Sequence, residues 1–176
     1  MKTLVIIGAG PGGYECAVKA AKTGLDVHVF DDEGHVGGTC LCEGCIPTKC
    51  LCHSAEVFAT VKQAEEYGLK TDTTTFDYAH VITRKEKIVA QMQAGVKTLL
   101  QTPGITFHPV RARFAPQDAH TICYGEERLH ADAVIIATGS QPKFLPIPGA
   151  HLPGVCNRVF TPACIWATIF SLRVIT

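Results

Sequence analysis

The sequence predicts an α/β fold in which a parallel sheet with a glycine-rich crossover is accompanied by a small β-meander. Two short apolar runs, 4–7 and 133–137, have the composition of strands that are buried on both faces. The first run leads into a glycine-rich turn and a helical segment, the arrangement of a βαβ unit. Short strand-like segments between residues 105 and 131 predict the meander. With 176 residues, the chain has room for one domain with a proper core.

Residues 1–31 have the pattern of a strand, a helix and a second strand. The first strand runs into Gly8-Ala9-Gly10-Pro11-Gly12-Gly13, which fits the motif G-x-G-x-x-G, and Gly24 predicts the end of the helix. The second strand ends at Asp31, 21 residues beyond Gly10. This context predicts a dinucleotide-binding unit, although the motif alone does not separate FAD from NAD.

Each part of this unit has a physical role in the prediction. Gly8 permits the tight turn, Gly10 lets the backbone approach a pyrophosphate, and Gly13 lets the helix pack closely on the strand. The helix that starts beside Pro11 offers its N–H groups and positive dipole end to phosphates. Asp31 can accept hydrogen bonds from the ribose hydroxyls of an adenosine.

The remaining elements follow from apolar periodicity and from Gly and Pro positions. Residues 32–46 are expected to form a loop, and a helix is expected from Pro47 to Gly68. A second amphipathic helix is expected over about 77–101, before Pro103-Gly104. Short strands are expected at 105–107, 110–114, 121–124, 129–131 and 133–137, and a turn is expected at 138–140.

Composition excludes several classes of protein. The 16 basic and 16 acidic residues balance, so we expect neither a nucleic-acid partner nor a membrane partner. No apolar run reaches the length of a membrane span, and no signal peptide is recognised. Nine cysteines in such a chain favour a cytoplasmic protein with one redox-active pair over a structural disulfide framework.

The segment 37–49 carries the candidate chemistry. Cys40 and Cys45 are separated by four residues, so a disulfide within this loop is sterically plausible. Cys45 lies at the expected helix start, where the dipole stabilises a thiolate, and Lys49 adds positive charge one turn further on. Gly37 and Gly38 allow the backbone to lie against a flat ring. A thiolate beside an oxidised flavin can donate electron density to it, while the other cysteine exchanges with an external disulfide or dithiol.

Two other interpretations remain open for these residues. A thiolate metal site could use the cysteines of this region together with His53, since Cys42-x-x-Cys45 has a metal-like spacing. The expected helix start at Pro47 argues against it, and we expect no metal. Lys49 could be a solvated surface lysine. The remaining cysteines are expected to be small, buried or half-buried residues: Cys16, Cys42, Cys50, Cys52, Cys123, Cys156 and Cys164.

The residues Gly37-Gly38-Thr39-Cys40-x-x-x-x-Cys45-Ile46-Pro47-Thr48-Lys49 resemble the redox-disulfide signature of the class I pyridine nucleotide-disulfide oxidoreductases. The residues of this signature are most similar to those of the dihydrolipoyl dehydrogenase branch. Mercuric and glutathione reductases more often carry Val in place of Leu41 and Ile46. The resemblance covers about residues 2–150 and includes the turn Ala137-Thr138-Gly139. It implies a Rossmann-like FAD-binding domain, incomplete relative to the family.

The resemblance also implies roles for single residues. Cys45 would be the thiol against the flavin and Cys40 the interchange thiol that faces the substrate. Lys49 would lie near the reactive edge of the flavin, and the backbone of Ala112 would meet the adenine. Further FAD contacts would come from Gly8, Gly10, Pro11, Gly13, Asp31, Gly38, Thr39, Thr138 and Gly139. One departure is Cys42, where the family usually has Asn, because a third thiol in the loop could scramble the pair.

The implied reaction is oxidation of dihydrolipoamide, free or lipoyl-protein-bound, through the Cys40–Cys45 disulfide and FAD to NAD. The family enzyme is a homodimer with separate NAD-binding and dimerisation domains, and neither is found in this sequence. Residues 151–176 form an atypical apolar tail, which we interpret as a truncated or out-of-frame end. We therefore expect a fragment that does not complete NAD-linked turnover alone. The alternatives are another reductase of the family, a stand-alone flavin-binding module, or a metal-thiolate protein on a nucleotide-binding scaffold.

Overall fold

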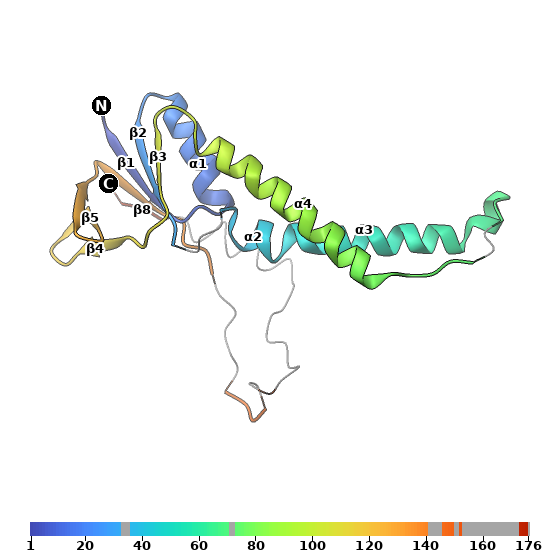
Figure 1. Cartoon of the computed structure of the whole chain (residues 1–176). Coiled ribbons are helices and arrows are strands. Elements are labelled where there is room, and N and C mark those ends of the chain that lie inside the picture. The colour runs from blue at the N-terminus through green and yellow to red at the C-terminus, as the bar shows by residue number, and fades with distance from the viewer. Residues whose placement is uncertain (33–35, 71–72, 141–145, 150–151, 153–172, 176) are drawn as a thin grey trace.

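Two sheets and a helical arm make up the computed structural model, which describes residues 1–32, 36–70, 73–140, 146–149, 152 and 173–175 (Figure 1). The predicted boundary at residue 150 and nearly all of the tail 151–176 lie outside the described residues. The elements in chain order are β1 (Thr3–Ile7), α1 (Pro11–Lys22), β2 (Asp26–Phe30), α2 (Gly38–Cys42), α3 (Cys45–Lys62), the 3₁₀ helix η1 (Ala64–Tyr67), α4 (Tyr78–Leu99), β3 (Ile105–His108), β4 (Arg113–Ala115), β5 (Asp118–Tyr124), β6 (Glu127–His130), β7 (Ala133–Ile136) and β8 (Arg173–Ile175).

The larger sheet has the strand order β3-β2-β1-β7-β8, which confirms the predicted α/β class. Strands β1, β2, β3 and β7 run parallel, while β8 pairs antiparallel with β7. The strand predicted at 105–107 belongs to this sheet and not to the meander. Ile105 pairs with Val27, so β3 extends the parallel sheet beside β2, and α4 forms part of the crossover that leads to it. Ile105 and Phe107 pack against the core below the helices, which favours this position.

The smaller sheet is the predicted meander, with the order β4-β5-β6. Its first strand begins at Arg113, three residues later than expected, because the chain turns tightly after β3 and the Val110 N–H donates to the His108 carbonyl at 2.8 Å. Strand β5 begins earlier than expected, at Asp118, whose carboxylate accepts from the His120 N–H and the Thr121 hydroxyl. The position of the meander was therefore predicted correctly, whereas the bounds of its strands were predicted wrongly.

The core has two parts, one on each face of the parallel sheet. Leu4 and Ile6 of β1 point to the side of α1 and α4, and Val5 points to the side of the meander. This alternation is what a strand imposes on successive side chains. Because both faces are covered, residues 4–7 of β1 and all of β7 are apolar. The largest fully buried side chains on the meander side are those of Phe30 and Ile122.

The arm is the hairpin of α3 and α4, which projects away from the sheet (Figure 1). Asp77 caps α4 by accepting from the His80 N–H at 3.0 Å, close to the predicted start. Helix α3 ends at Lys62, earlier than predicted, since the chain tightens into η1 before Gly68 takes a left-handed φ of 77°. None of the helices in the described part of the chain is long and apolar enough to cross a membrane.

Two histidines join β2 to the edge strand β3. The His28 Nδ1 and His108 Nε2 atoms are 2.9 Å apart with nearly parallel ring planes, and the His108 ring stacks on Phe30. A hydrogen bond between two ring nitrogens requires one of them to be unprotonated. Burial and then the charge of His28 lower the pKa of His108, and Glu127 opposes them. The other ring nitrogen of His28, Nε2, lies 3.4 Å from the Asp26 Oδ2 atom.

We expect acid to destabilise the fold through this pair. A lowered folded-state pKa means that the unfolded chain binds more protons, so the contribution of His108 is present above about pH 6.5 and is lost as the pH falls below it. Urea unfolding at pH 7 and pH 5 should therefore show a larger loss of stability for the wild type than for His108→Phe. An equal loss in both proteins would show that His108 is not responsible.

Candidate functional site

The glycine-rich turn lies where β1 and β7 end. Gly8 has a φ of +108°, and a Cβ there would lie 2.3 Å from the Ala137 carbonyl oxygen. A Cβ on Gly13 would lie 1.8 Å from the Gly8 carbonyl oxygen, which only a glycine avoids. The predicted tight turn at Gly8 and the predicted close packing at Gly13 are both confirmed. The start of α1 is thereby held against the carboxyl edge of the sheet, where open α/β sheets bind ligands.

A second glycine pair crosses this turn. The Gly37 N–H donates to the Ala9 carbonyl at 2.9 Å, and Gly38 has a φ of +59°. A Cβ on Gly38 would lie 2.9 Å from the Cα of Gly10. The two backbones therefore touch, and the first residue of α2 rests on the cap residue of α1. No side chain caps α1, which leaves its first turn suited to a phosphate group.

Asp31 fastens the turn from the end of β2. Its Oδ2 atom accepts from the Ala9 N–H at 2.6 Å, and its own N–H donates to the His108 carbonyl at 3.1 Å. The half-buried carboxylate is thus held beside the glycine-rich turn. A ribose contact by Asp31 stays a prediction, and the position of its carboxylate agrees with it.

The other expected cofactor contacts lie around the same edge. Pro11 is the first residue of α1, after the cap residue Gly10. Thr138 and Gly139 follow β7, and the Thr138 Cα is 3.2 Å from where a Gly8 Cβ would sit. Ala112 is half-buried against the core on the meander side. These residues fit an extended dinucleotide better than a small ligand, because they lie along the ends of neighbouring strands.

The segment 37–49, called the redox loop from here on, contains more helix than expected. Residues 38–42 form the short helix α2, and α3 begins at Cys45, two residues before Pro47. The Gly44 N–H donates to the Thr39 carbonyl at 2.7 Å and the Thr48 N–H donates to the Gly44 carbonyl at 3.0 Å, so one turn leads directly into the next helix. Pro47 fits in this first turn because N–H groups there need no helical partner. Thr39 is exposed on α2.

The structure brings the side chains of Cys40 and Cys45 together, and a hydrogen bond joins them. Burial, a hydrogen bond to the Cys45 side chain and the charge of Cys45 raise the pKa of Cys40 to about 11. Lys49 and the Cys45 N–H act in the opposite direction and do not offset them. Cys40 therefore keeps its proton at neutral pH.

Two neighbours of the cysteines were missed by sequence reasoning. Gln93 of α4 donates from Nε2 to the Cys42 Sγ at 3.2 Å. Tyr14 of α1 lies near enough for Cys40 to help raise the pKa of its phenol, after burial and Glu15. Both residues are far from the loop in the sequence, so no motif spacing links them to it. Only the position of Tyr14, directly after the glycine motif, could have suggested that it faces the crossing loop.

The metal interpretation finds no support in the geometry. Cys52 and His53 are exposed on α3, and the His53 Nδ1 lies 3.6 Å from a Glu56 carboxylate oxygen. Within the described residues, no group of three or more His, Cys, Asp or Glu side chains is placed to hold a metal ion.

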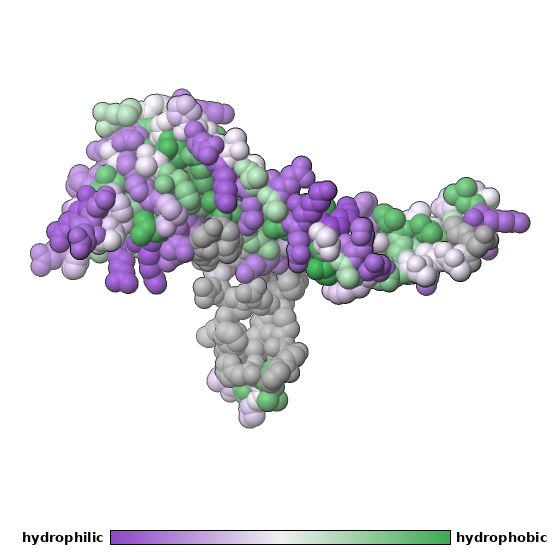
Figure 2. All heavy atoms as spheres, viewed as in Figure 1, coloured by the Kyte–Doolittle hydropathy of each residue, from purple (hydrophilic) through white to green (hydrophobic). Residues whose placement is uncertain are grey.

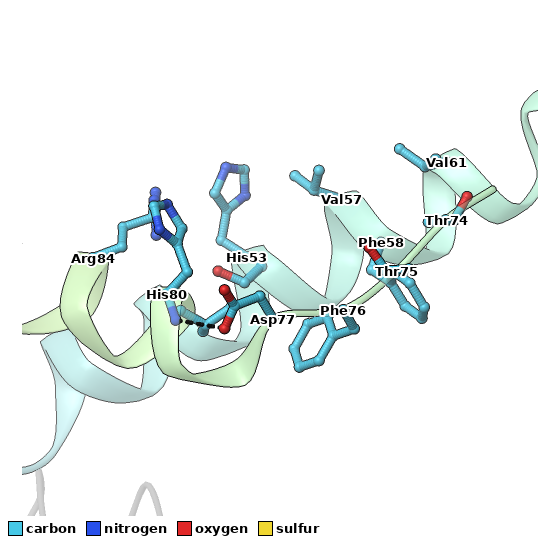
Figure 3. A pocket seen from close by; sticks show the side chains of 12 residues that line it. His53, Val57, Phe58, Val61, Thr74, Thr75, Phe76, Asp77, His80 and Arg84 are labelled. Carbon is cyan, nitrogen blue, oxygen red and sulfur yellow. Dashed lines mark hydrogen bonds between the residues drawn. The ribbon is translucent and has the colours of Figure 1, made fainter. Parts of the chain in front are cut away.

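A groove of about 440 Å³ lies elsewhere, on the arm between α3, the segment 74–77 and the start of α4 (Figure 3). Val57, Phe58 and Phe76 line one part of it, while His53, His80 and Arg84 gather at the other. The hydrophobic surface of the distal arm is visible in Figure 2 and includes Val57 and Phe76. None of the residues predicted for the redox pair or for cofactor binding lines this groove.

Known proteins resemble this chain over most of its length. A family model described as pyridine nucleotide-disulphide oxidoreductase matches residues 2–164. The chain belongs to this family. It is 40% identical over 147 residues to a dihydrolipoyl dehydrogenase of Acholeplasma laidlawii, covering 83% of this chain and 43% of the relative. It is also 40% identical over 148 residues to a dihydrolipoyl dehydrogenase of Bacillus subtilis strain 168, covering 82% of this chain and 32% of the relative.

A solved structure gives the same result. The HOCl-induced flavoprotein disulfide reductase RclA from Escherichia coli is 30% identical, with a TM-score of 0.68 over 84% of this chain and 30% of that chain. The chain thus spans less than half the length of these relatives. The predicted family is confirmed.

Proposed function

We propose that this chain is the FAD-binding and dithiol-oxidising part of a flavoprotein disulfide reductase of the dihydrolipoyl dehydrogenase kind. One observation carries the proposal. Cys40 lies on α2 and is hydrogen-bonded to Cys45, the first residue of α3. The first residue of α2, Gly38, touches Gly10 of the dinucleotide-type turn, so the proposed redox pair lies beside the proposed nucleotide cradle. Relatives named dihydrolipoyl dehydrogenase support the choice of substrate.

Different residues would contact different parts of FAD. The first turn of α1 would face the pyrophosphate, Asp31 the adenosine ribose, and the backbone near Ala112 the adenine. Thr138 and Gly139, with Gly38 and Thr39, would line the flavin side. Bound FAD would supply a two-electron acceptor beside the thiols, and NAD would be the final acceptor in the complete enzyme. A homodimer is part of the same proposal for the complete enzyme.

The chemistry of the pair is thiol–disulfide exchange. In the oxidised pair, a substrate thiolate attacks the Cys40 sulfur and the Cys40–Cys45 bond breaks, with Cys45 leaving as a thiolate. The second substrate thiol, once deprotonated, attacks the substrate sulfur of this mixed disulfide. That step closes the cyclic disulfide of the product and releases Cys40, which takes up a proton. Cys45 takes up the second proton that the substrate has lost, so two electrons and two protons enter the pair and it becomes a dithiol. Lys49, exposed one turn beyond Cys45, adds positive charge near the developing thiolates.

FAD binding tests the proposal through Asp31. We expect Asp31→Asn to weaken FAD binding by the full chain about tenfold, since a charge-assisted hydrogen bond to the ribose is lost. Asp26→Asn is a matched control because it changes a carboxylate at the opposite end of the same strand. Flavin fluorescence titration gives both affinities, and thermal melting shows whether either variant unfolds. A wild-type chain that binds no FAD, or an unchanged affinity in folded Asp31→Asn, would contradict the proposal.

A further inference from the structure

A third thiol lies inside the redox loop, and the structure holds it on the far side of its helix. Cys42 follows Cys40 by two positions in α2, and residues so spaced project from opposite sides of a helix. The Cys40 side chain is hydrogen-bonded to Cys45, whereas Cys42 faces the α4 side of the loop. Its sulfur accepts from Gln93 Nε2 at 3.2 Å, and its thiol donates to the Val36 carbonyl oxygen at 3.7 Å.

Sequence spacing alone would not keep this thiol out of the chemistry. Cys42 and Cys45 are three residues apart, across the turn that joins α2 to α3, so a short rotation of α2 could bring their sulfurs together. A Cys42 thiolate could then attack the Cys45 sulfur of the oxidised pair. The 40–45 bond would break, a 42–45 bond would form, and Cys40 would leave and take up the proton that Cys42 lost. The exchange needs no external oxidant and would disable the pair.

We propose that Gln93 is a positioning residue that keeps Cys42 out of the redox pair. The amide of Gln93 is half-buried on α4 and ties α2 to that helix through the Cys42 sulfur. Leu41, between the two cysteines, is buried in the same core, so α2 is fixed by a buried leucine and by this hydrogen bond. The restraint acts on the direction in which the thiol points. This inference rests on the proposed function, because Gln93 would protect the same Cys40–Cys45 pair from exchange with Cys42.

The test compares disulfide partners in full chains that have been equilibrated in a glutathione redox buffer and trapped with acid. In the wild type, peptide mass mapping should find Cys45 paired with Cys40. Gln93→Met keeps the side-chain length and removes the donor, and it should raise the share of disulfides that contain Cys42 about fivefold, the equilibrium value of one net hydrogen bond. Gln91→Met makes the same chemical change at an exposed position two residues earlier in α4, and should leave the wild-type pattern unchanged.

A further variant separates positioning from general loosening of the fold. Gln93→Met combined with Cys42→Ser should restore the Cys40–Cys45 pattern, because the competing thiol is gone. If Gln93→Met does not fold, Gln93→Ala carries the same comparison. A wild-type pattern in the folded Gln93 variant, or an equal rise in the Gln91 control, would overturn the role of Gln93. A wild type without the Cys40–Cys45 bond would instead overturn the redox pair itself, so the two failures are distinguishable.

Discussion

Cys45→Ser is expected to abolish reduction of bound flavin by dihydrolipoamide, with a rate at least about a thousandfold below that of the wild type. A serine hydroxyl cannot form the disulfide that the substrate reduces, so the Cys40–Cys45 pair is lost. Stopped-flow absorbance of the FAD-loaded chain under anaerobic conditions measures the rate. Cys40→Ser should have the same effect.

Cys52→Ser is the matched control for this prediction. Cys52 lies on the same helix as Cys45 and is exposed, so its replacement removes a thiol without touching the pair. We expect a rate within about twofold of the wild type, as for an exposed surface substitution. A Cys45→Ser variant that still reduces flavin at the wild-type rate would show that electrons reach the cofactor by another route.

Gly13→Ala is expected to cost about 3 kcal/mol of unfolding free energy, at the upper end of the range for overpacking substitutions. The added Cβ would lie 1.8 Å from the backbone oxygen of Gly8, and the nearby backbone of Ala137 already crowds Gly8 from the other side. Because backbone atoms surround the position, no side-chain rotation relieves the clash. Helix α1 must move away from β1. Urea unfolding followed by circular dichroism measures the loss.

Gly95→Ala is the opposite case within the same chain. Gly95 lies in α4, and a Cβ there would meet nothing within 4 Å. Alanine should therefore stabilise the protein by about 0.5–1 kcal/mol through helix propensity alone. If Gly13→Ala is tolerated as well as Gly95→Ala, the close contact between α1 and β1 has been misjudged.

The local parts of the fold could be predicted from the sequence. The βαβ unit around Gly8 and Gly13 was predictable because its glycines, its strand and its helix are neighbours in the chain, and each has a steric or hydrogen-bonding reason. The start of α4 followed from Asp77, which caps it. The buried strand at 133–137 followed from composition alone.

What the sequence missed depends on contacts between distant residues. Strand β3 pairs with β2 across the whole helical arm, and no local pattern distinguishes it from a strand of the meander. Helix α2 has five residues, too few for a periodic signal, and depends on the crossing of Gly38 over Gly10. The start of α3 was placed at Pro47 by a rule that also allows proline later in the first turn.

The same distinction applies to the site. The pair of Cys40 and Cys45 could be proposed from spacing and from the resemblance, because both residues lie in one loop. The partner of Cys42 could not, since Gln93 is brought to it by the packing of α4 on α2. The environment of Cys40 also needed the structure. Burial is the main cause of its raised pKa and exceeds the opposite effect of Lys49.

The central claim is that Cys40 and Cys45 form the redox pair of this chain, and the oxidised wild-type protein tests it most directly. Mild oxidation, alkylation of the remaining thiols and peptide mass mapping identify each disulfide. We expect a single dominant bond between Cys40 and Cys45, reduced again by one equivalent of dihydrolipoamide. Cysteines 40 and 45 recovered as alkylated thiols, or each bonded to some other cysteine, would contradict the account.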